Sequence, residues 1–260
     1  MFAFGTPSTA IDTTTLSQES GGLAFLRAEW RDLVMLNFEV APQLLEPLVP
    51  AGVELDRWAG RLFASVVGFH FRDTRVLRLP IPGHRAFAEV NLRFYVRRHA
   101  GREVRRGVVF VRELVPRRAI ATLARLLYNE PYRALPMRHR IQQRPGDGVV
   151  EREFGWRVGR DWTRVVATTE GAPRPLVPGS EEEFITEHYW GYTRQRDGGT
   201  IEYRVDHPRW NVWTATDARL DGNVAPVYGD AFAEALSGPP VSAFVADGSP
   251  VTVYAPSRIR

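Results

Sequence analysis

Short runs rich in Val, Phe and Leu, separated by turn residues, recur along most of this chain. They have little helical spacing, so they favour β-strands. Strands are predicted over residues 33–40, 61–71, 87–96, 103–115, 149–158, 162–169, 189–194, 200–206 and 210–219, with a last hairpin over 243–254 around Asp247-Gly248. About ten strands with few helices predict a mostly β (α+β) fold, either a closed or nearly closed antiparallel β-barrel or a sandwich.

Three short helices are predicted among these strands. Residues 42–49 begin with a proline in the first turn. Residues 116–128 carry apolar side chains at helical spacing. Residues 181–187 form a helical turn that Ser180 caps. No repeat, long linker or strong break in composition divides the chain, which favours one domain.

The first 22 residues differ in composition from the rest of the chain. They are rich in Ser, Thr and Gly and lack the basic start and apolar core of a signal peptide. We therefore predict a flexible tail over residues 1–22 and a single domain over residues 23–260. No apolar run approaches the length of a membrane span, so we expect a cytoplasmic protein without membrane contact.

Two residue types are missing from the sequence. There is no cysteine, which excludes disulfides, thiolate nucleophiles and zinc–thiolate sites. There is no lysine, since every basic residue among the 34 is an arginine. A side-chain Schiff base is therefore excluded, and so is a P-loop. The six histidines are dispersed without metal-ligand spacing, and we predict neither a metal nor a cofactor.

Arginines gather in the middle of the chain. Residues 91–164 contain 18 arginines and 7 acids. Such a block can bind nucleic acid, which we keep as an alternative function. The arginines are, however, scattered through strand-like segments, and no zinc finger, RNP motif or recognition helix accompanies them. The other explanation is a solvated face, or arginines paired with acids on neighbouring strands.

The segment 87–96 alternates between apolar and polar side chains. Ala88, Val90, Leu92, Phe94 and Val96 share one face, so Phe87, Glu89, Asn91, Arg93 and Tyr95 share the other. In a sandwich the polar face would meet water. In a barrel it would instead line an interior where paired polar groups orient a ligand. Periodicity alone leaves both arrangements open.

Four segments resemble landmarks of the YqjF-like family of uncharacterised bacterial proteins, and the resemblance extends from about residue 23 to residue 259. They are Phe87-x-Glu89-x-Asn91-x-Arg93-x-Tyr95-Val96, Glu183-Phe-Ile-Thr-Glu187-His-Tyr189, His207-Pro-x-Trp210 and Val251-x-Val-Tyr254. One position departs from the family pattern, because relatives more often carry Arg where this chain has His188.

The YqjF-like proteins are in turn similar in fold to acetoacetate decarboxylase, a β-barrel enzyme with an enclosed site. Arg125 and Pro131 match its pattern, and Glu89 falls where it has an active-site glutamate. Tyr132 and Arg133 stand where it has its lysine pair. The resemblance therefore implies the enclosed cavity and removes Schiff-base decarboxylation. By fold analogy, it also suggests a homodimer through sheet edges.

Two functions follow for such a cavity, and in both it binds a small anionic metabolite. In the first, the protein is a lyase-like or isomerase-like enzyme that catalyses an aldol, dehydration or isomerisation step with Glu89 and Tyr132 as catalytic residues. In the second it binds the metabolite without chemistry. The substrate-binding candidates are Asn91, Arg93, Arg125, Arg133, His188 and Tyr189. Arg112 and Glu113 point to opposite faces of their strand, so at most one faces the cavity.

Overall fold

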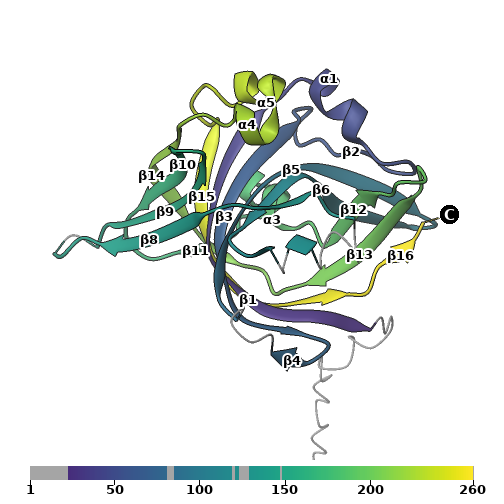
Figure 1. Cartoon of the computed structure of the whole chain (residues 1–260), viewed down its shortest axis with the longest axis horizontal. Helices are drawn as coiled ribbons and strands as arrows, with labels where there is room; N and C mark the ends of the chain where they lie inside the picture. The colour runs from purple at the N-terminus through teal and green to yellow at the C-terminus, as the bar shows by residue number, and fades with distance from the viewer. Residues whose placement is uncertain (1–22, 81–84, 119–120, 123–128, 147, 260) are drawn as a thin grey trace, which may run out of the picture.

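A computed structural model of the chain describes residues 23–80, 85–118, 121–122, 129–146 and 148–259. The predicted tail at residues 1–22 lies outside these ranges. So does most of the predicted helix at 116–128, of which Arg118, Ala121 and Thr122 are described and helical. In the described part the protein is mostly β, as the sequence predicts (Figure 1).

A ring of paired strands is the main feature of the described part of the chain. Following hydrogen-bonded neighbours leads around the ring and back, because β13 pairs with both β12 and β15. Neighbours in the ring are antiparallel except β12 and β6, which are parallel. In order, the ring contains β13 (Thr200–Asp206), β12 (Trp190–Arg194), β6 (Glu103–Val115), β5 (Phe87–Ala100), β3 (Phe63–Val76), β1 (Ala24–Glu39) and β15 (Ser242–Tyr254).

A second run of strands leaves the ring at β15 and forms the arm at the left of Figure 1. It consists of β14 (Asn211–Asp221), β10 (Asp161–Thr169), β9 (Val150–Val158) and β8 (Met137–Gln143). Short strands complete the sheet: β2 (Glu54–Leu55), β4 (Leu79–Pro80), β7 (Tyr132–Ala134), β11 (Arg174–Pro175) and β16 (Ser257–Arg258).

The described helices are short. The predicted helix at 42–49 is confirmed as α1 (Pro42–Leu45), which continues as a 3₁₀ turn, η1 (Glu46–Leu48). The predicted turn at 181–187 is confirmed as α3 (Glu181–Thr186), and the Ser180 hydroxyl accepts from the Glu183 N–H over 3.1 Å. Two further helices, α4 (Ala225–Tyr228) and α5 (Asp230–Ala235), were not predicted.

Strand β5 is buried on both faces. Its apolar face, with Val90, Leu92 and Phe94 fully buried, packs in the larger hydrophobic cluster together with Phe154 and Trp156 of the arm. Its other face belongs to the inside of the ring, where Glu89 and Asn91 are only 2% and 3% exposed. The polar face of residues 87–95 therefore does not meet bulk water, as it would in a two-sheet sandwich.

The hairpin predicted at residues 243–254 is wrong, because β15 runs through Asp247-Gly248 without a turn. Gly248 has φ of +79° and lies against β1, where an added Cβ would approach the Trp30 carbonyl oxygen to 2.0 Å. The glycine therefore serves a close approach of two strands. The Asp247 carboxylate accepts hydrogen bonds from Asn211, at the start of β14.

Candidate functional site

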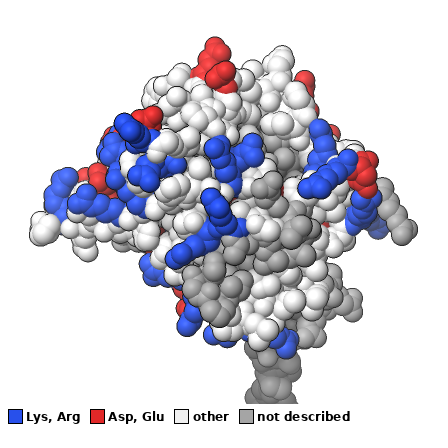
Figure 2. All heavy atoms as spheres, in the orientation of Figure 1, with Lys and Arg blue, Asp and Glu red and all other residues white. Residues whose placement is uncertain are grey.

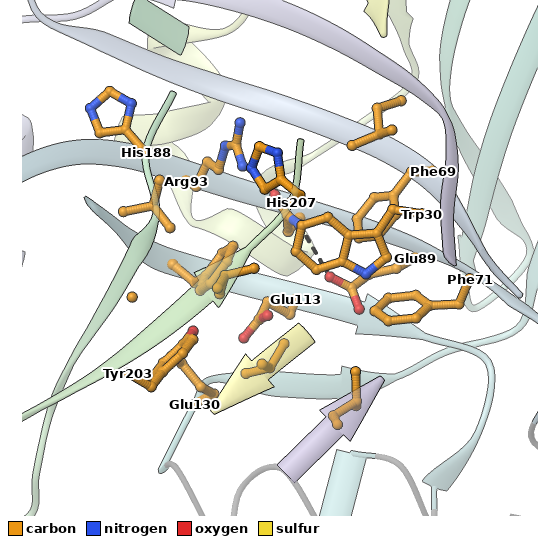
Figure 3. Close-up of a pocket in the computed structure, with 18 of the residues that line it drawn as sticks. Trp30, Phe69, Phe71, Glu89, Arg93, Glu113, Glu130, His188, Tyr203 and His207 are labelled. Atoms are coloured by element: carbon orange, nitrogen blue, oxygen red, sulfur yellow. Dashed lines mark hydrogen bonds between the residues drawn. The ribbon is translucent and has the colours of Figure 1, made fainter. Parts of the chain in front are cut away.

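The inside of the ring contains a cavity of about 230 Å³. This is smaller than the roughly 300–1,000 Å³ of pockets that hold drug-sized ligands, so it suits a small metabolite. Aromatic side chains of several strands form much of its wall, among them Trp30, Phe69, Phe71 and Tyr203 (Figure 3). An apolar wall of this kind strengthens the polar interactions made against it.

Polar side chains of three adjacent strands meet at this wall. Glu89 and Asn91 lie on β5, Glu113 on β6 and Tyr132 on β7. The strand register brings them together, because Asn91 is opposite Glu113 and Glu113 is opposite Tyr132. Asn91 Nδ2 donates to Glu89 Oε1 over 3.1 Å, and the Tyr132 hydroxyl donates to Glu89 Oε2 over 3.3 Å.

A third carboxyl group, Glu130, lies just before β7 and also lines the cavity. Its Oε1 accepts hydrogen bonds from the Thr193 hydroxyl at 2.5 Å and the Tyr203 hydroxyl at 2.9 Å. Figure 3 shows Glu89, Glu113 and Glu130 around the same part of the cavity. Three carboxyl groups thus share one buried region.

Burial sets the protonation of this cluster. It raises the pKa of Glu89 to about 7 and that of Glu130 to about 7, in both cases against the lowering effect of their hydrogen bonds. Burial and the neighbouring glutamates raise the pKa of Glu113 well above its usual range. Burial also raises the pKa of Tyr132, which keeps its hydroxyl protonated. A carboxyl group with a pKa near 7 can act as acid or base at neutral pH.

Arg93 brings a positive charge to the same cavity. Its Nη2 donates to the Ile185 carbonyl oxygen over 3.3 Å and lies 4.0 Å from Met35 Sδ. Its Nε is buried and has no partner. Among the residues that the structure describes, no carboxylate pairs with Arg93. Its guanidinium can therefore receive an anionic group of a ligand.

The comparisons with known proteins agree with this architecture. A family model, DUF2071, whose description is "Uncharacterized conserved protein", matches residues 27–257. The chain belongs to the DUF2071 family. The uncharacterized protein YqjF of Bacillus subtilis (strain 168) is 29% identical over 213 residues, which cover 79% of this chain and 81% of that protein. The resemblance to the YqjF-like family is thereby confirmed.

Solved structures extend the similarity of this DUF2071 chain to the acetoacetate decarboxylase-like fold. Acetoacetate decarboxylase from Legionella pneumophila gives a TM-score of 0.63 at 13% identity, covering 100% of this chain and 98% of that one. The enduracididine biosynthesis enzyme MppR complexed with pyruvate gives a TM-score of 0.63 at 16% identity, covering 95% of this chain and 94% of that one. MppR complexed with the condensation product of pyruvate and imidazole 4-carboxaldehyde gives a TM-score of 0.62 at 14% identity, covering 98% of this chain and 97% of that one.

His188 also lines the cavity of this DUF2071 chain. Its Nε2 lies 3.4 Å from Asp56 Oδ2, and the same carboxylate oxygen accepts from Arg106 Nε over 2.7 Å. Burial lowers the pKa of His188 to about 4. The imidazole is therefore neutral at pH 7, and its buried Nδ1 has no partner. His188 offers a ligand a neutral polar contact.

The structure brings together five of the eight predicted site residues. Glu89, Asn91, Arg93, Tyr132 and His188 all line the cavity.

Arg133 and Tyr189 are not on the cavity wall. Adjacent residues of a strand point to opposite sides, so Arg133 turns away from Tyr132 and donates to the Pro226 carbonyl oxygen over 2.8 Å. The Tyr189 hydroxyl donates to Glu187 over 2.7 Å. Arg125 lies outside the described residues.

Sequence reasoning did not select the cavity residues Glu113, Glu130 and Tyr203. Of Arg112 and Glu113, the glutamate is the one that faces the cavity. Alternation along one strand predicts which residues share a face, but it does not show which residue of the next strand lies opposite. Glu130 stands two positions before Tyr132, and this spacing is a signal that could have indicated it.

Part of the arginine-rich segment 91–164 is engaged with acids. Seven of its arginines form ion pairs in the described structure: Arg97, Arg98, Arg105, Arg106, Arg138, Arg152 and Arg164. On the face shown in Figure 2, acidic side chains stand beside the arginines of the arm and of the opposite edge. This distribution favours arginines paired with neighbouring strands over a continuous basic surface for nucleic acid.

The described residues contain neither a metal-ligand cluster nor a membrane-spanning helix. Within them, no group of three or more His, Asp or Glu side chains is arranged to hold a metal ion. None of the helices in the described ranges is both long and apolar enough to span a bilayer.

Proposed function

We propose that the ring of strands acts as a barrel whose cavity binds a small carboxylate, of the keto-acid kind, and catalyses acid–base chemistry on it without a Schiff base. The proposed step is of the aldol, dehydration or isomerisation type. None of these requires a covalent intermediate, which suits a chain without lysine and cysteine side chains.

The observation that carries this proposal is the hydrogen bond from Tyr132 to Glu89 inside the cavity. None of the described arginines forms an ion pair with Glu89, and its described hydrogen-bond partners are Asn91 and Tyr132. With its pKa raised to about 7, it exists in both protonation states at neutral pH. These are the properties expected of a general base rather than of a structural carboxylate.

The residues suggest a division of roles. The carboxylate of the ligand pairs with Arg93, which places its carbonyl group toward the polar cluster. Glu89 in its carboxylate form takes a proton from the carbon beside the carbonyl. Once Glu89 holds that proton, the Tyr132 hydroxyl no longer donates to Glu89. It can then donate to the developing enolate oxygen. The aromatic wall keeps water out during this step.

The structural neighbours support the choice of ligand class. MppR shares the fold, and its structures contain pyruvate in one case and a condensation product of pyruvate in another. A barrel of this kind is therefore compatible with keto acids and with condensation chemistry. The low identity means that the residues of this chain, and not the similarity, carry the mechanism.

The test begins with binding and then measures proton transfer. The melting temperature of the protein is measured with a panel of 2-keto acids and simple carboxylates, and native mass spectrometry of freshly purified protein looks for a co-purifying small acid. Pyruvate in D₂O with the protein is then followed by proton NMR. We expect stabilisation and faster loss of the methyl protons than without protein. Absence of stabilisation by every anion contradicts the proposal, whereas binding without exchange supports the non-catalytic alternative.

A further inference from the structure

Two side-chain oxygens of cavity-lining residues are buried without a hydrogen-bond partner among the described residues. They are Asn91 Oδ1 and Glu113 Oε2, on residues that are each 3% exposed. The two residues are opposite each other on β5 and β6, so their Cβ atoms are about 5 Å apart. A buried polar oxygen without a partner is unfavourable. A ligand that brings donors to this place would remove that cost.

The same region has an excess of acid. Glu89, Glu113 and Glu130 are 2%, 3% and 4% exposed, and in the described structure none of them has a cationic partner. The chain has no lysine that could supply one. Burying carboxyl groups together without a cation is unfavourable, and their raised pKa values reflect this. The cluster is therefore complementary to a positive charge, which none of the described residues supplies.

A buried donor that needs an acceptor lies on the same strand, two residues after Asn91. Arg93 Nε is a buried donor without a partner, and its guanidinium has no carboxylate among the described residues. Two residues of a strand span about 7 Å. Figure 3 shows Arg93, Glu89 and Glu113 at the same cavity. The cavity thus presents a cation and a set of orphan acceptors, of which the one on β5 is two residues from Arg93.

We propose that the ligand is a zwitterion whose carboxylate pairs with Arg93 and whose cationic nitrogen group, an ammonium or a guanidinium, donates to Asn91 Oδ1 and Glu113 Oε2. This inference rests on the proposed function and narrows its substrate class. It also explains why three carboxyl groups are placed together. When the cation arrives, the glutamates release protons, because an adjacent positive charge favours their ionised form.

Isothermal titration calorimetry with three probes tests the inference on the intact protein. The probes are 4-guanidinobutanoate, which carries both charges, hexanoate, which carries only the carboxylate, and butylguanidine, which carries only the cation. Titrations at pH 7 in phosphate and in Tris report protons exchanged on binding. We expect 4-guanidinobutanoate to bind at least about tenfold more tightly than either single-charge probe, which corresponds to about 1.4 kcal/mol. We also expect proton release with it and none with hexanoate.

The variant Glu113→Gln separates the charge from the shape of the site. It should weaken 4-guanidinobutanoate by about tenfold or more and hexanoate by less than about twofold. Glu54→Gln, at an exposed ion pair with Arg97, is the matched control and should change neither affinity. If Glu113→Gln does not fold by circular dichroism, the proton release of the unmodified protein decides the question.

The outcomes separate the two proposals. If hexanoate binds and 4-guanidinobutanoate binds no more tightly and releases no proton, the zwitterion is refuted while the proposed function stands. If neither carboxylate binds, the proposed function fails and the inference fails with it. Tighter binding of 4-guanidinobutanoate with proton release supports both.

Discussion

The Tyr132 hydroxyl on β7 reaches Glu89 on β5 across the intervening strand β6, with an oxygen–oxygen distance of 3.3 Å. The contact exists because β7 pairs in parallel with β6 and places Tyr132 opposite Glu113. It joins a carboxyl group whose pKa is raised to about 7 to a hydroxyl that stays protonated. This pair therefore couples a proton acceptor to a hydrogen-bond donor in one cavity.

Replacing Glu89 should separate binding from proton transfer. Glu89→Gln keeps the shape of the side chain and one of its two acceptor oxygens but removes its ability to take a proton. We expect the exchange of pyruvate methyl protons in D₂O to fall by about 10²-fold or more, as for loss of a general base. The stabilisation of the protein by pyruvate should change little. An exchange rate equal to that of the unmodified protein would exclude Glu89 as the base.

The arginines of the site offer a matched comparison. Arg93 faces the cavity without a carboxylate partner in the described structure, whereas Arg133 lies outside it and donates to Pro226. Arg93→Gln should weaken carboxylate binding by about tenfold or more, since a charge-assisted hydrogen bond contributes about 1.5–3 kcal/mol. Arg133→Gln should leave binding unchanged. Affinities from calorimetry that fall equally in both variants would argue for a general charge effect.

The raised pKa of Glu89 also predicts a pH dependence of stability. Below pH 4.5, its ordinary pKa, the group is protonated in the folded and unfolded chains alike. Between pH 4.5 and about 7 only the unfolded chain loses the proton, so the folded state loses stability as pH rises. Glu89→Gln does not titrate. Its free energy of unfolding, relative to the unmodified protein, should therefore increase by about 3 kcal/mol from pH 4 to pH 8.

The comparison between variant and unmodified protein is needed because histidines act in the opposite direction. Burial lowers the pKa of His70, His188 and His207 to about 4, so these groups destabilise the folded state as pH falls below 6.5. Their contribution cancels in the difference. Glu54→Gln is a control of opposite sign, because Arg97 lowers the pKa of Glu54 and the variant should lose relative stability as pH rises. Urea denaturation from pH 4 to pH 8 gives the free energy of unfolding of Glu89→Gln relative to the unmodified protein. If this difference does not change with pH, Glu89 is not a buried, protonated carboxyl group.

Much of the fold and part of the site could be predicted from the sequence. The two-residue alternation of 87–96 showed which side chains share a face, and the resemblance to acetoacetate decarboxylase indicated that the polar face looks inward. Glu113 and Glu130 became evident only with the register of β6 and β7, which depends on contacts between distant segments. Arg133 was selected because it stands beside Tyr132, but strand β7 turns neighbouring side chains to opposite sides.

The seam between β1 and β15 is the place where a turn signal misled the prediction. Asp-Gly is the commonest hairpin dipeptide, yet Gly248 stands inside a continuous strand. The reason is steric and involves a residue far away in the sequence, since the Trp30 carbonyl oxygen occupies the space of a side chain at this position. Local sequence cannot distinguish a glycine that makes a turn from one that admits another backbone.

This seam gives a last prediction, because two glycines with similar backbone angles differ in their surroundings. Gly248 and Gly101 have φ of +79° and +64°, so an alanine is strained at both. A Cβ at Gly101 meets nothing within 4 Å, and we expect Gly101→Ala to cost about 1 kcal/mol. A Cβ at Gly248 would lie 2.0 Å from the Trp30 carbonyl oxygen and 2.8 Å from Leu33 Cδ1.

Gly248→Ala should therefore cost about 3 kcal/mol or more, since β1 and β15 must separate to admit the methyl group. Trp30 forms part of the cavity wall, so the displacement should also weaken ligand binding, which Gly101→Ala should leave unchanged. Chemical denaturation gives the free energies of unfolding, and calorimetry with 4-guanidinobutanoate gives the binding. Equal losses of stability in the two variants would mean that β1 and β15 do not approach as closely at Gly248 as the ring requires.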